Sequence, residues 1–325
     1  MMKKILVTGS SVEERFFEPL KDLGFVVENP KNLLSEDELS SELSDAEGYL
    51  LGGDEVASSK ALSKAPNLKV ISFLGVGYES FVDVAGAREL GITVTNTPGV
   101  LANSVAEFTV GQLLNARRKL TKYCNAYARG DQGKEEKQSD IAGHKVGIVG
   151  LGAIGTRIAE ILVSGFNADV SYYSRTRKPH EETRLKVRYA KLPDLMREVE
   201  MLVVMVPDTP ETQGMVSAAL LKTMPANSIL VNTARPEVVD PRGLAECLES
   251  GVIQVAAFDG FYESRDHGQL TDQLKSFGTD RLLITGHIAS LTHDARDAMA
   301  TRAVSSLCNI LSGRPDPYVA VSGTR

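Results

Sequence analysis

The chain has 325 residues, of which 42% are hydrophobic and 24% charged, and its formal net charge is −6 at pH 7. This is the composition of an ordinary globular protein, and the length favours two domains. The negative charge argues against a general nucleic-acid binder. The start, MMKKILVTGS, has too short an apolar run for a signal peptide, and no apolar run of membrane-spanning length follows. We therefore expect a cytoplasmic protein with no membrane or nucleic-acid partner.

Cysteine usage agrees with that expectation. Cys124, Cys247 and Cys308 are scattered without C-x-x-C spacing. We expect them to be buried free thiols in a reducing compartment.

Short apolar runs alternate with amphipathic stretches along the first hundred residues. Strands are predicted at 3–9, 25–29, 46–53, 68–75 and 91–97, and helical patterns lie between them at 12–24, 35–45, 58–67 and 83–91. Strands that alternate with helices imply a parallel sheet covered on both faces.

The same alternation starts again at residue 144. Further strands are predicted at 170–173, 201–206, 228–233, 253–258 and 281–285. A long helical stretch, 104–130, joins the two halves, and the polar segment 130–140 is predicted to be a surface loop. A last amphipathic stretch, 293–313, is placed to cross back onto the first half. The fold class is thus α/β, with two doubly wound parallel-sheet domains.

A glycine-rich turn follows the first strand of the second half. Gly150-Leu151-Gly152-Ala153-Ile154-Gly155 has the G-x-G-x-x-G pattern, with an apolar strand before it and a helical pattern after it. Such glycines let a dinucleotide's pyrophosphate approach the helix N-terminus. The alternative is a tight turn without a ligand, but the strand–turn–helix context favours a dinucleotide site.

The segment SYYSRTRKP, 171–179, lies where such a site usually has an acid that binds the ribose 2′-hydroxyl. Ser174, Arg175, Thr176 and Arg177 stand there instead. A hydroxyl and basic groups suit a 2′-phosphate, so the segment predicts NADP rather than NAD. The alternative is a solvated basic loop.

Two further charged or titratable residues follow strands. Arg235 comes directly after the strand ending in VNT, and His287 ends the segment LLITGH. Single residues of these types are more often structural. At the ligand edge of a parallel sheet, however, they suggest an Arg for a carboxylate or carbonyl oxygen and a His as proton donor.

These motifs together resemble the D-isomer-specific 2-hydroxyacid dehydrogenase family. GLGAIG, VNTAR with VVD, AAFDGF and TGHIAS occur in the family's order, and GVGYESFVDVAGARELGITVTNTPGVLANSVAE resembles its first domain. The segment YYSRTRKP is similar to that of the NADPH-preferring hydroxypyruvate, glyoxylate and hydroxyphenylpyruvate reductases. The resemblance covers nearly the whole chain.

The resemblance implies a discontinuous, flavodoxin-like substrate domain, about 1–100 and 290–325, a Rossmann cofactor domain, about 101–289, and a homodimer. It implies that Arg235 and the backbone N–H groups of Val76 and Gly77 bind the substrate, and that His287 donates the proton. The implied cofactor-binding residues are Val105, Gly150, Gly152, Ala153, Ile154, Gly155, Ser174, Arg175, Thr176, Arg177, Val206, Pro207, Thr212, Thr233, Ala234 and Asp259.

The chain departs from the family pattern at several positions. Gly286 replaces a proline before His287, and Pro236 replaces a glycine after Arg235. One residue is also added between Gly77 and Asp83.

A further departure concerns the family's catalytic glutamate. Its position is Ser264, and the nearest acid, Glu263, stands one residue early. We expect Glu263 to be the partner of His287. The alternatives are a His287 that acts unassisted or one that uses another acid such as Asp266.

The resulting prediction is an NADPH-dependent reductase that converts a small 2-keto acid to the D-2-hydroxy acid. A catalytically weak nucleotide-sensing protein of the corepressor type is the alternative on the same fold. Retention of Arg235 and His287 argues against that alternative. A formate or phosphite oxidase would favour NAD and an acid at position 174, which is Ser174 here.

Overall fold

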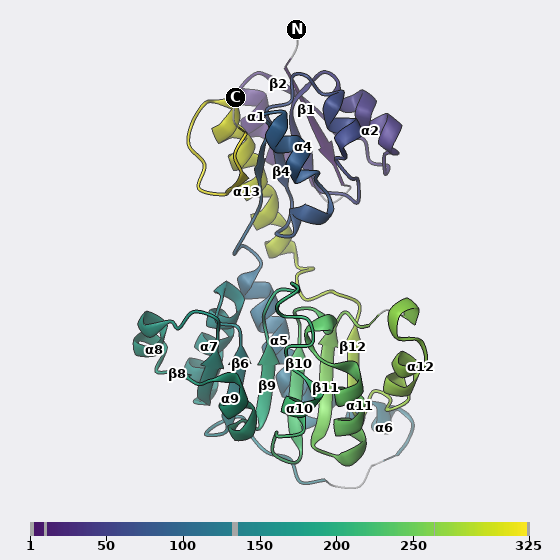
Figure 1. Ribbon diagram of the computed structural model, residues 1–325, viewed down its shortest axis with the longest axis vertical. Coiled ribbons are helices and arrows are strands. Elements are labelled where there is room, and N and C mark those ends of the chain that lie inside the picture. The colour runs from purple at the N-terminus through teal and green to yellow at the C-terminus, as the bar shows by residue number, and fades with distance from the viewer. Residues whose placement is uncertain (1–2, 10–11, 132–135, 263, 324–325) are drawn as a thin grey trace. The chain divides into compact units, whose positions relative to one another are not determined.

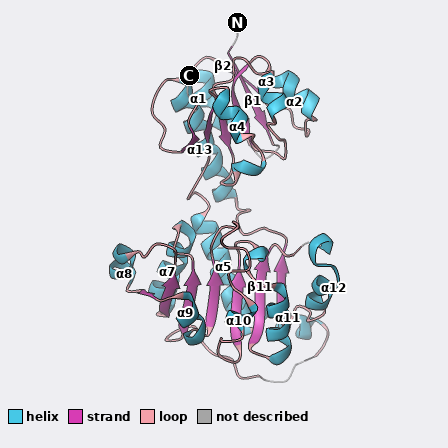
Figure 2. Cartoon of the chain, in the orientation of Figure 1, coloured by secondary structure: helices cyan, strands magenta, loops and turns pink. Residues whose placement is uncertain are grey.

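The protein is described by a computed structural model over residues 3–9, 12–131, 136–262 and 264–323 (Figure 1). The chain forms two compact units. Unit 1 comprises Met1–Leu101 and Thr292–Arg325, and unit 2 comprises Ala102–Leu291. Within each unit the strands lie side by side and helices cover both faces of the sheet (Figure 2). This is the doubly wound α/β architecture expected from the alternation of strands and helices.

In its described residues, unit 1 has a six-stranded sheet of order β13-β5-β4-β3-β1-β2. The strands are β1 (Lys3–Thr8), β2 (Phe25–Glu28), β3 (Ala46–Leu51), β4 (Val70–Phe73), β5 (Thr93–Thr95) and β13 (Val319–Val321). The helices are α1 (Glu18–Asp22), α2 (Glu36–Leu43), α3 (Ser59–Ser63), α4 (Val84–Glu89) and α13 (His293–Leu311), with 3-10 turns η1 (Glu14–Phe17) and η2 (Tyr78–Ser80).

The sheet of unit 1 has apolar side chains on both faces, because helices cover each. Leu6 faces a core shared with α2, α3 and α4, whereas its neighbours Ile5 and Val7 face a core shared with α1 and α13. Helix α13 thus returns the end of the chain to unit 1, where the Ser72 hydroxyl donates to the carbonyl of Ala303 at 3.0 Å.

Unit 2 has, over the same described ranges, a seven-stranded parallel sheet of order β12-β11-β10-β9-β6-β7-β8. The strands are β6 (Lys145–Val149), β7 (Asp169–Tyr173), β8 (Arg188–Tyr189), β9 (Met201–Val204), β10 (Ser228–Asn232), β11 (Ile253–Asp259) and β12 (Leu282–Thr285). The helices are α5 (Ala102–Arg118), α6 (Leu120–Ala128), α7 (Ala153–Phe166), α8 (Pro179–Leu185), α9 (Leu192–Glu198), α10 (Ala218–Leu221), α11 (Pro241–Ser250) and α12 (Ser264–Lys275), with the 3-10 turn η3 (Pro236–Val238).

The helical stretch expected over 104–130 is two helices rather than one. Lys119 adopts a left-handed conformation with φ of 50° and separates α5 from α6. The Asn115 side chain stabilises the break, because its Oδ1 accepts bonds of 3.0 Å from both the backbone N–H and the hydroxyl of Thr121. A helical pattern alone does not reveal such a side-chain cap.

Two short edge strands and one exposed cysteine differ from the sequence prediction. The strands β8 and β13 are short, and β13 pairs antiparallel with β5 at the edge of an otherwise parallel sheet. Cys247 and Cys308 are buried free thiols as expected, but Cys124 is exposed because it lies on α6 at the surface of unit 2. No helix in the described part of the chain has the length and apolar character needed to span a membrane.

Candidate active site

The parallel strands of unit 2 bring most predicted site residues to one edge of the sheet. Strand β6 pairs with β7 on one side and with β9 on the other, so the strand order reverses between β6 and β9. In doubly wound folds, ligands bind beyond the carboxyl ends of the strands at this switch point. The segments that follow β6, β7, β9, β10, β11 and β12 all leave the sheet at this edge.

The glycine-rich turn lies at the switch point itself. Gly150 has a φ of 107°, and a side chain there would collide with the carbonyl of Met205, which follows β9. A Cβ on Gly155 would collide with the carbonyl of Gly150, so α7 packs directly against the turn. Gly152, by contrast, has open space where a Cβ would stand, and it directly precedes α7. The turn therefore leaves the N-terminus of a helix open to a ligand.

The basic segment follows β7, the strand next to β6. The Ser174 hydroxyl is nearly buried and donates to the carbonyl of Thr176 at 2.6 Å. Arg175 is exposed, and no ion pair or hydrogen bond within the described residues occupies its guanidinium. Arg177 differs, because its guanidinium binds the carboxylate of Glu182 through two hydrogen bonds.

The segment that follows β9 is closed by a threonine. The Thr212 hydroxyl donates to the carbonyl of Pro207 at 2.6 Å and accepts the N–H of Thr209 at 2.8 Å. These bonds fold residues 206–212 into a compact loop beside the glycine-rich turn. The Thr212 hydroxyl thus stabilises the predicted nucleotide-flanking loop through hydrogen bonds inside the loop itself.

Asn232, the last residue of β10, determines how Arg235 leaves the sheet. Its side chain accepts the N–H of Ala234 at 3.0 Å and donates to the carbonyl of Arg235 at 2.8 Å. Arg235 is exposed, and its Nη1 donates to the carbonyl of Ala234 at 2.8 Å. The turn therefore presents a guanidinium with further donors available at the sheet edge.

Two buried threonines join this turn to α5. The hydroxyls of Thr109 and Thr233 are 2.6 Å apart, and the Thr109 hydroxyl lies 2.6 Å from the carbonyl of Val105. A carbonyl only accepts, so Thr109 donates to Val105 and Thr233 donates to Thr109. The chain of bonds connects two of the predicted cofactor residues, Val105 and Thr233.

Asp259 holds the segment that carries His287. One carboxylate oxygen accepts the hydroxyl of Thr285 at 2.7 Å and the N–H of Ile288 at 2.8 Å. The other oxygen accepts the N–H of Ala289 at 2.7 Å. Asp259 is only 2% exposed, which favours an anchoring role over direct contact with a cofactor.

His287 itself has a φ of 58°, a left-handed conformation that is uncommon for a residue with a side chain. The bonds that Thr285, Ile288 and Ala289 donate to Asp259 stabilise this conformation from both sides of His287. The imidazole is exposed, and a Cβ at Gly260 would lie 3.4 Å from its Nδ1. The Nδ1 side of the ring thus faces the segment that follows β11.

Glu263, the predicted partner of His287, falls in that same segment. It lies outside the residues that the structure describes, and so do the side chains of 264–267. Glu263 and its alternative Asp266 therefore stay predictions.

The predicted substrate residues of unit 1 follow β4. Val76 and Gly77 are exposed, and neither N–H donates a hydrogen bond within the described residues. Side chains that follow β5 hold this loop by hydrogen bonds. Asn96 donates to the carbonyl of Val76 at 3.1 Å, and Thr97 donates to the carbonyl of Gly75. The added residue before Asp83 falls in a segment that contains η2. Two free N–H groups in a held loop are suited to an anion.

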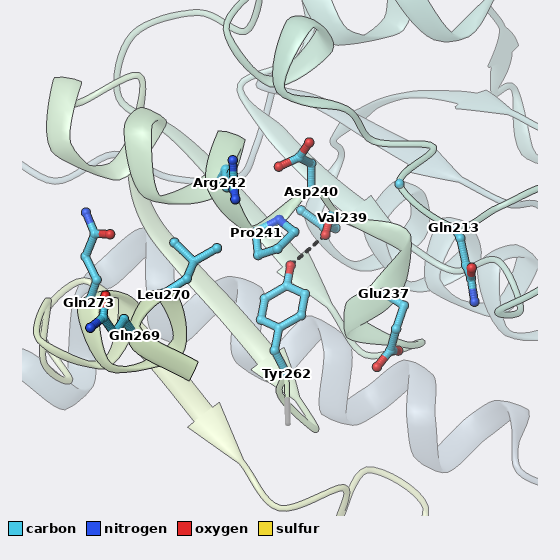
Figure 3. A pocket seen from close by; sticks show the side chains of 11 residues that line it. Gln213, Glu237, Val239, Asp240, Pro241, Arg242, Tyr262, Gln269, Leu270 and Gln273 are labelled. Atoms are coloured by element: carbon cyan, nitrogen blue, oxygen red, sulfur yellow. Dashed lines mark hydrogen bonds between the residues drawn. The ribbon is translucent and has the colours of Figure 1, made fainter. Parts of the chain in front are cut away.

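A pocket of about 830 Å³ lies elsewhere in unit 2 (Figure 3). Tyr262 forms part of its wall and donates to the carbonyl of Val239 at 2.7 Å. Its walls include Glu237 and Asp240 but none of Gly150, Arg235 or His287. The predicted site is therefore not this pocket.

Comparison with known proteins identifies the family of the chain. Residues 110–289 match the NAD binding domain of the D-isomer specific 2-hydroxyacid dehydrogenases. The chain belongs to this family. The matched range contains the glycine-rich turn, the basic segment, Arg235, Asp259 and His287, so an NAD-binding domain of this family is present in unit 2.

Similar proteins cover nearly all of the chain. A glyoxylate reductase of Pyrococcus furiosus is 31% identical over 326 residues, which cover 98% of this chain and 95% of the relative. A crystal structure of a Thermus thermophilus protein has a TM-score of 0.82 at 32% identity and covers 98% of this chain and 100% of its own. A 2-hydroxyacid dehydrogenase of Ketogulonicigenium vulgare has a TM-score of 0.82 at 25% identity, with both chains covered completely.

Asn232 and Thr109 were not predicted as site residues. An Asn at the end of a strand is a known turn former, so the sequence did carry a signal for Asn232. Thr109 lies within a helical pattern, and nothing in that pattern shows that its hydroxyl meets Thr233.

We expect Asp259→Asn to destabilise unit 2 and to loosen the His287 segment. The amide would turn an N–H toward at least one of the three donors, and leaving a buried donor without an acceptor costs roughly 1–3 kcal/mol. Thermal unfolding would show a lower Tm, and hydrogen exchange would be faster at the amides of Ile288 and Ala289. Asp169→Asn, at an exposed ion pair with Arg188, is the control. Unchanged exchange at these two amides would contradict the anchoring role.

We expect Thr109→Val to lower the Tm more than Thr109→Ser. Valine has the same shape but leaves the buried Thr233 hydroxyl without its acceptor, at a cost of roughly 1–3 kcal/mol. Serine keeps the hydroxyl and loses only a methyl group. Equal Tm values for the two variants would show that the hydroxyl pair contributes no more to stability than the methyl group that serine lacks.

Proposed function

We propose that the protein is an NADPH-dependent reductase that converts a 2-keto acid to the D-2-hydroxy acid. The observation that carries the cofactor assignment is the end of β7, where Ser174 and an unpaired Arg175 occupy the position of an acid. Similarity to proteins named glyoxylate reductase supports the reaction, because glyoxylate is a 2-keto acid. We assign 1–100 and 290–325 as the substrate domain and 101–289 as the cofactor domain.

The residues present fit a dinucleotide phosphate. The open position at Gly152 and the N-terminus of α7 suit the pyrophosphate. Arg175 would hold the 2′-phosphate as a charge-assisted donor, together with the Thr176 hydroxyl. The Ser174 hydroxyl would join them by exchanging its bond to the Thr176 carbonyl for one to the phosphate. We leave Arg177 out of this set because Glu182 occupies its guanidinium. When bound, the cofactor supplies a hydride from C4 of its nicotinamide to C2 of the keto acid.

The side chains at the strand ends perform the remaining steps. Arg235 would bind the substrate carboxylate and offset the charge that develops on the carbonyl oxygen. The N–H groups of Val76 and Gly77 would bind the carboxylate from unit 1. His287 would donate a proton to the alkoxide, with Glu263 as its partner. Asp259 would position His287 through the backbone rather than contact the cofactor.

The family resemblance also carries our proposal of a homodimer that forms through the cofactor domains. Helix α6 supports it, since Tyr127 is 81% exposed and Leu120 is 50% exposed. Exposed apolar residues on one short helix are suited to an interface.

We expect Arg175→Ala to raise the KM for NADPH by about 10-fold or more and to leave the KM for NADH nearly unchanged. The lost contact is a charge-assisted bond worth roughly 1.5–3 kcal/mol. Steady-state kinetics with both cofactors and a panel of 2-keto acids measures this. Arg188→Ala, at an exposed arginine paired with Asp169, is the control. Equal losses with both cofactors would refute the 2′-phosphate contact.

We expect Arg235→Lys to lower kcat/KM for the keto acid by about 100-fold while NADPH affinity stays the same. Lysine keeps the charge but loses the planar fork that binds two oxygens at once. Cofactor titration and turnover on the same sample separate the two effects. Loss of NADPH affinity with normal turnover would make Arg235 a cofactor residue. Absence of turnover in the unaltered protein with every keto acid would favour the nucleotide-sensing alternative.

A further inference from the structure

The basic segment contains one arginine that is already occupied. Nε of Arg177 donates to Oε1 of Glu182 at 2.8 Å, and Nη2 donates to Oε2 at 2.7 Å. These two bonds use the edge of the guanidinium formed by Nε and Nη2, which is suited to bidentate binding of carboxylates and phosphates. The guanidinium also lies 5.7 Å from the ring centroid of Tyr189, which supports the same orientation.

Glu182 is fixed more firmly than its partner. Its side chain, on α8, is 16% exposed, whereas that of Arg177 is 62% exposed. Oε1 of Glu182 also accepts the hydroxyl of Tyr172 at 2.8 Å, and that hydroxyl accepts the N–H of Lys178 at 2.7 Å. The carboxylate is thus tied to the end of β7 and to the backbone of the basic segment.

Glu182 is charged at neutral pH. The hydrogen bonds from Arg177, and to a lesser degree the one from Tyr172, hold the pKa of its carboxyl below the ordinary value. It therefore neutralises the charge of Arg177 as well as occupying two of its five N–H donors.

Arg175 is in the opposite situation. It has no ion pair in the described residues, and its charge contributes only weakly to the lowered pKa of Glu211, which the Thr209 hydroxyl lowers most. Of the two arginines, Arg175 alone presents an unneutralised guanidinium.

We propose that Glu182 is a specificity-determining residue that withholds Arg177 from the cofactor, so that recognition of the 2′-phosphate depends on Arg175. This inference rests on the proposed NADPH preference. If Glu182 instead ordered the phosphate site, its removal would weaken binding of the 2′-phosphate. The proposal predicts that removal of the Glu182 charge strengthens that binding.

Adenosine 2′,5′-bisphosphate and 5′-AMP, titrated calorimetrically into the full chain, test the proposal without catalysis. The two ligands differ only by the 2′-phosphate. Glu182→Gln keeps the shape of the side chain but removes its charge, so Arg177 becomes available as a second cationic donor. We expect the variant to bind the bisphosphate about 3- to 10-fold more tightly and 5′-AMP unchanged. Glu181→Gln, at the neighbouring acid that pairs with Arg184, is the matched control and leaves both affinities unchanged.

Arg177 variants complete a double-mutant cycle. Arg177→Ala alone is expected to change bisphosphate affinity by less than about twofold, and in the Glu182→Gln background it is expected to remove the gain. Weaker or unchanged bisphosphate binding in Glu182→Gln overturns the proposal, and so does a large loss in Arg177→Ala alone. Loss of 5′-AMP binding in Glu182→Gln would reveal that this variant fails to fold. The bisphosphate affinity of Arg177→Ala alone then still tests the proposal.

The unaltered protein tests the proposed function separately. If it binds the bisphosphate no more tightly than 5′-AMP, the NADPH assignment fails. A gain in Glu182→Gln would still support the withholding role in that case, and the absence of a gain would overturn it.

Discussion

The candidate site depends on the close approach of two parallel strands, β6 and β9, at the reversal of strand order. Gly150 follows one strand and the carbonyl of Met205 follows the other, and no side chain fits between them. Because the described strands of the unit 2 sheet are parallel, β7, β10, β11 and β12 end at the same edge of the sheet as this contact. A shift in the register of β6 would therefore move the glycine-rich turn relative to the basic segment, Arg235 and His287 at this edge.

Backbone anchoring is the second constraint. Asp259 and Asn232 are the last residues of their strands, and each uses its side chain on the following turn rather than on a ligand. The exposed groups Arg235 and His287 are thereby held by buried neighbours. A left-handed conformation at His287 costs energy, and three bonds to one carboxylate offset that cost. The polar residues at the strand ends thus have two roles. Asp259 and Asn232 bind the backbone of the following turns, and these turns expose the side chains of His287 and Arg235.

Sequence periodicity predicted most strands and both sheets, because apolar runs bounded by glycine and asparagine are strong signals. It did not predict β13, which pairs in the opposite direction, or the break at Lys119, which depends on the side chain of Asn115. The glycine-rich turn and the strand-end residues were also readable, since each follows a strand directly. The direction of the Asp259 carboxylate was not, because it depends on where a segment nearly thirty residues later returns.

The basic segment shows why charge counted along a sequence differs from charge available at a site. Arg175, Arg177 and Lys178 stand within four residues, and from sequence they are equivalent donors. The fold distinguishes the two arginines, because β7 directs Tyr172 toward α8 and that helix brings Glu182 to Arg177. Neutralisation of one cation lowers the local positive potential without altering the shape of the segment. Under the proposed NADPH preference, such a site would discriminate between a hydroxyl and a phosphate through one free guanidinium, and its selectivity would depend on the acid on α8 as well as on the basic residues.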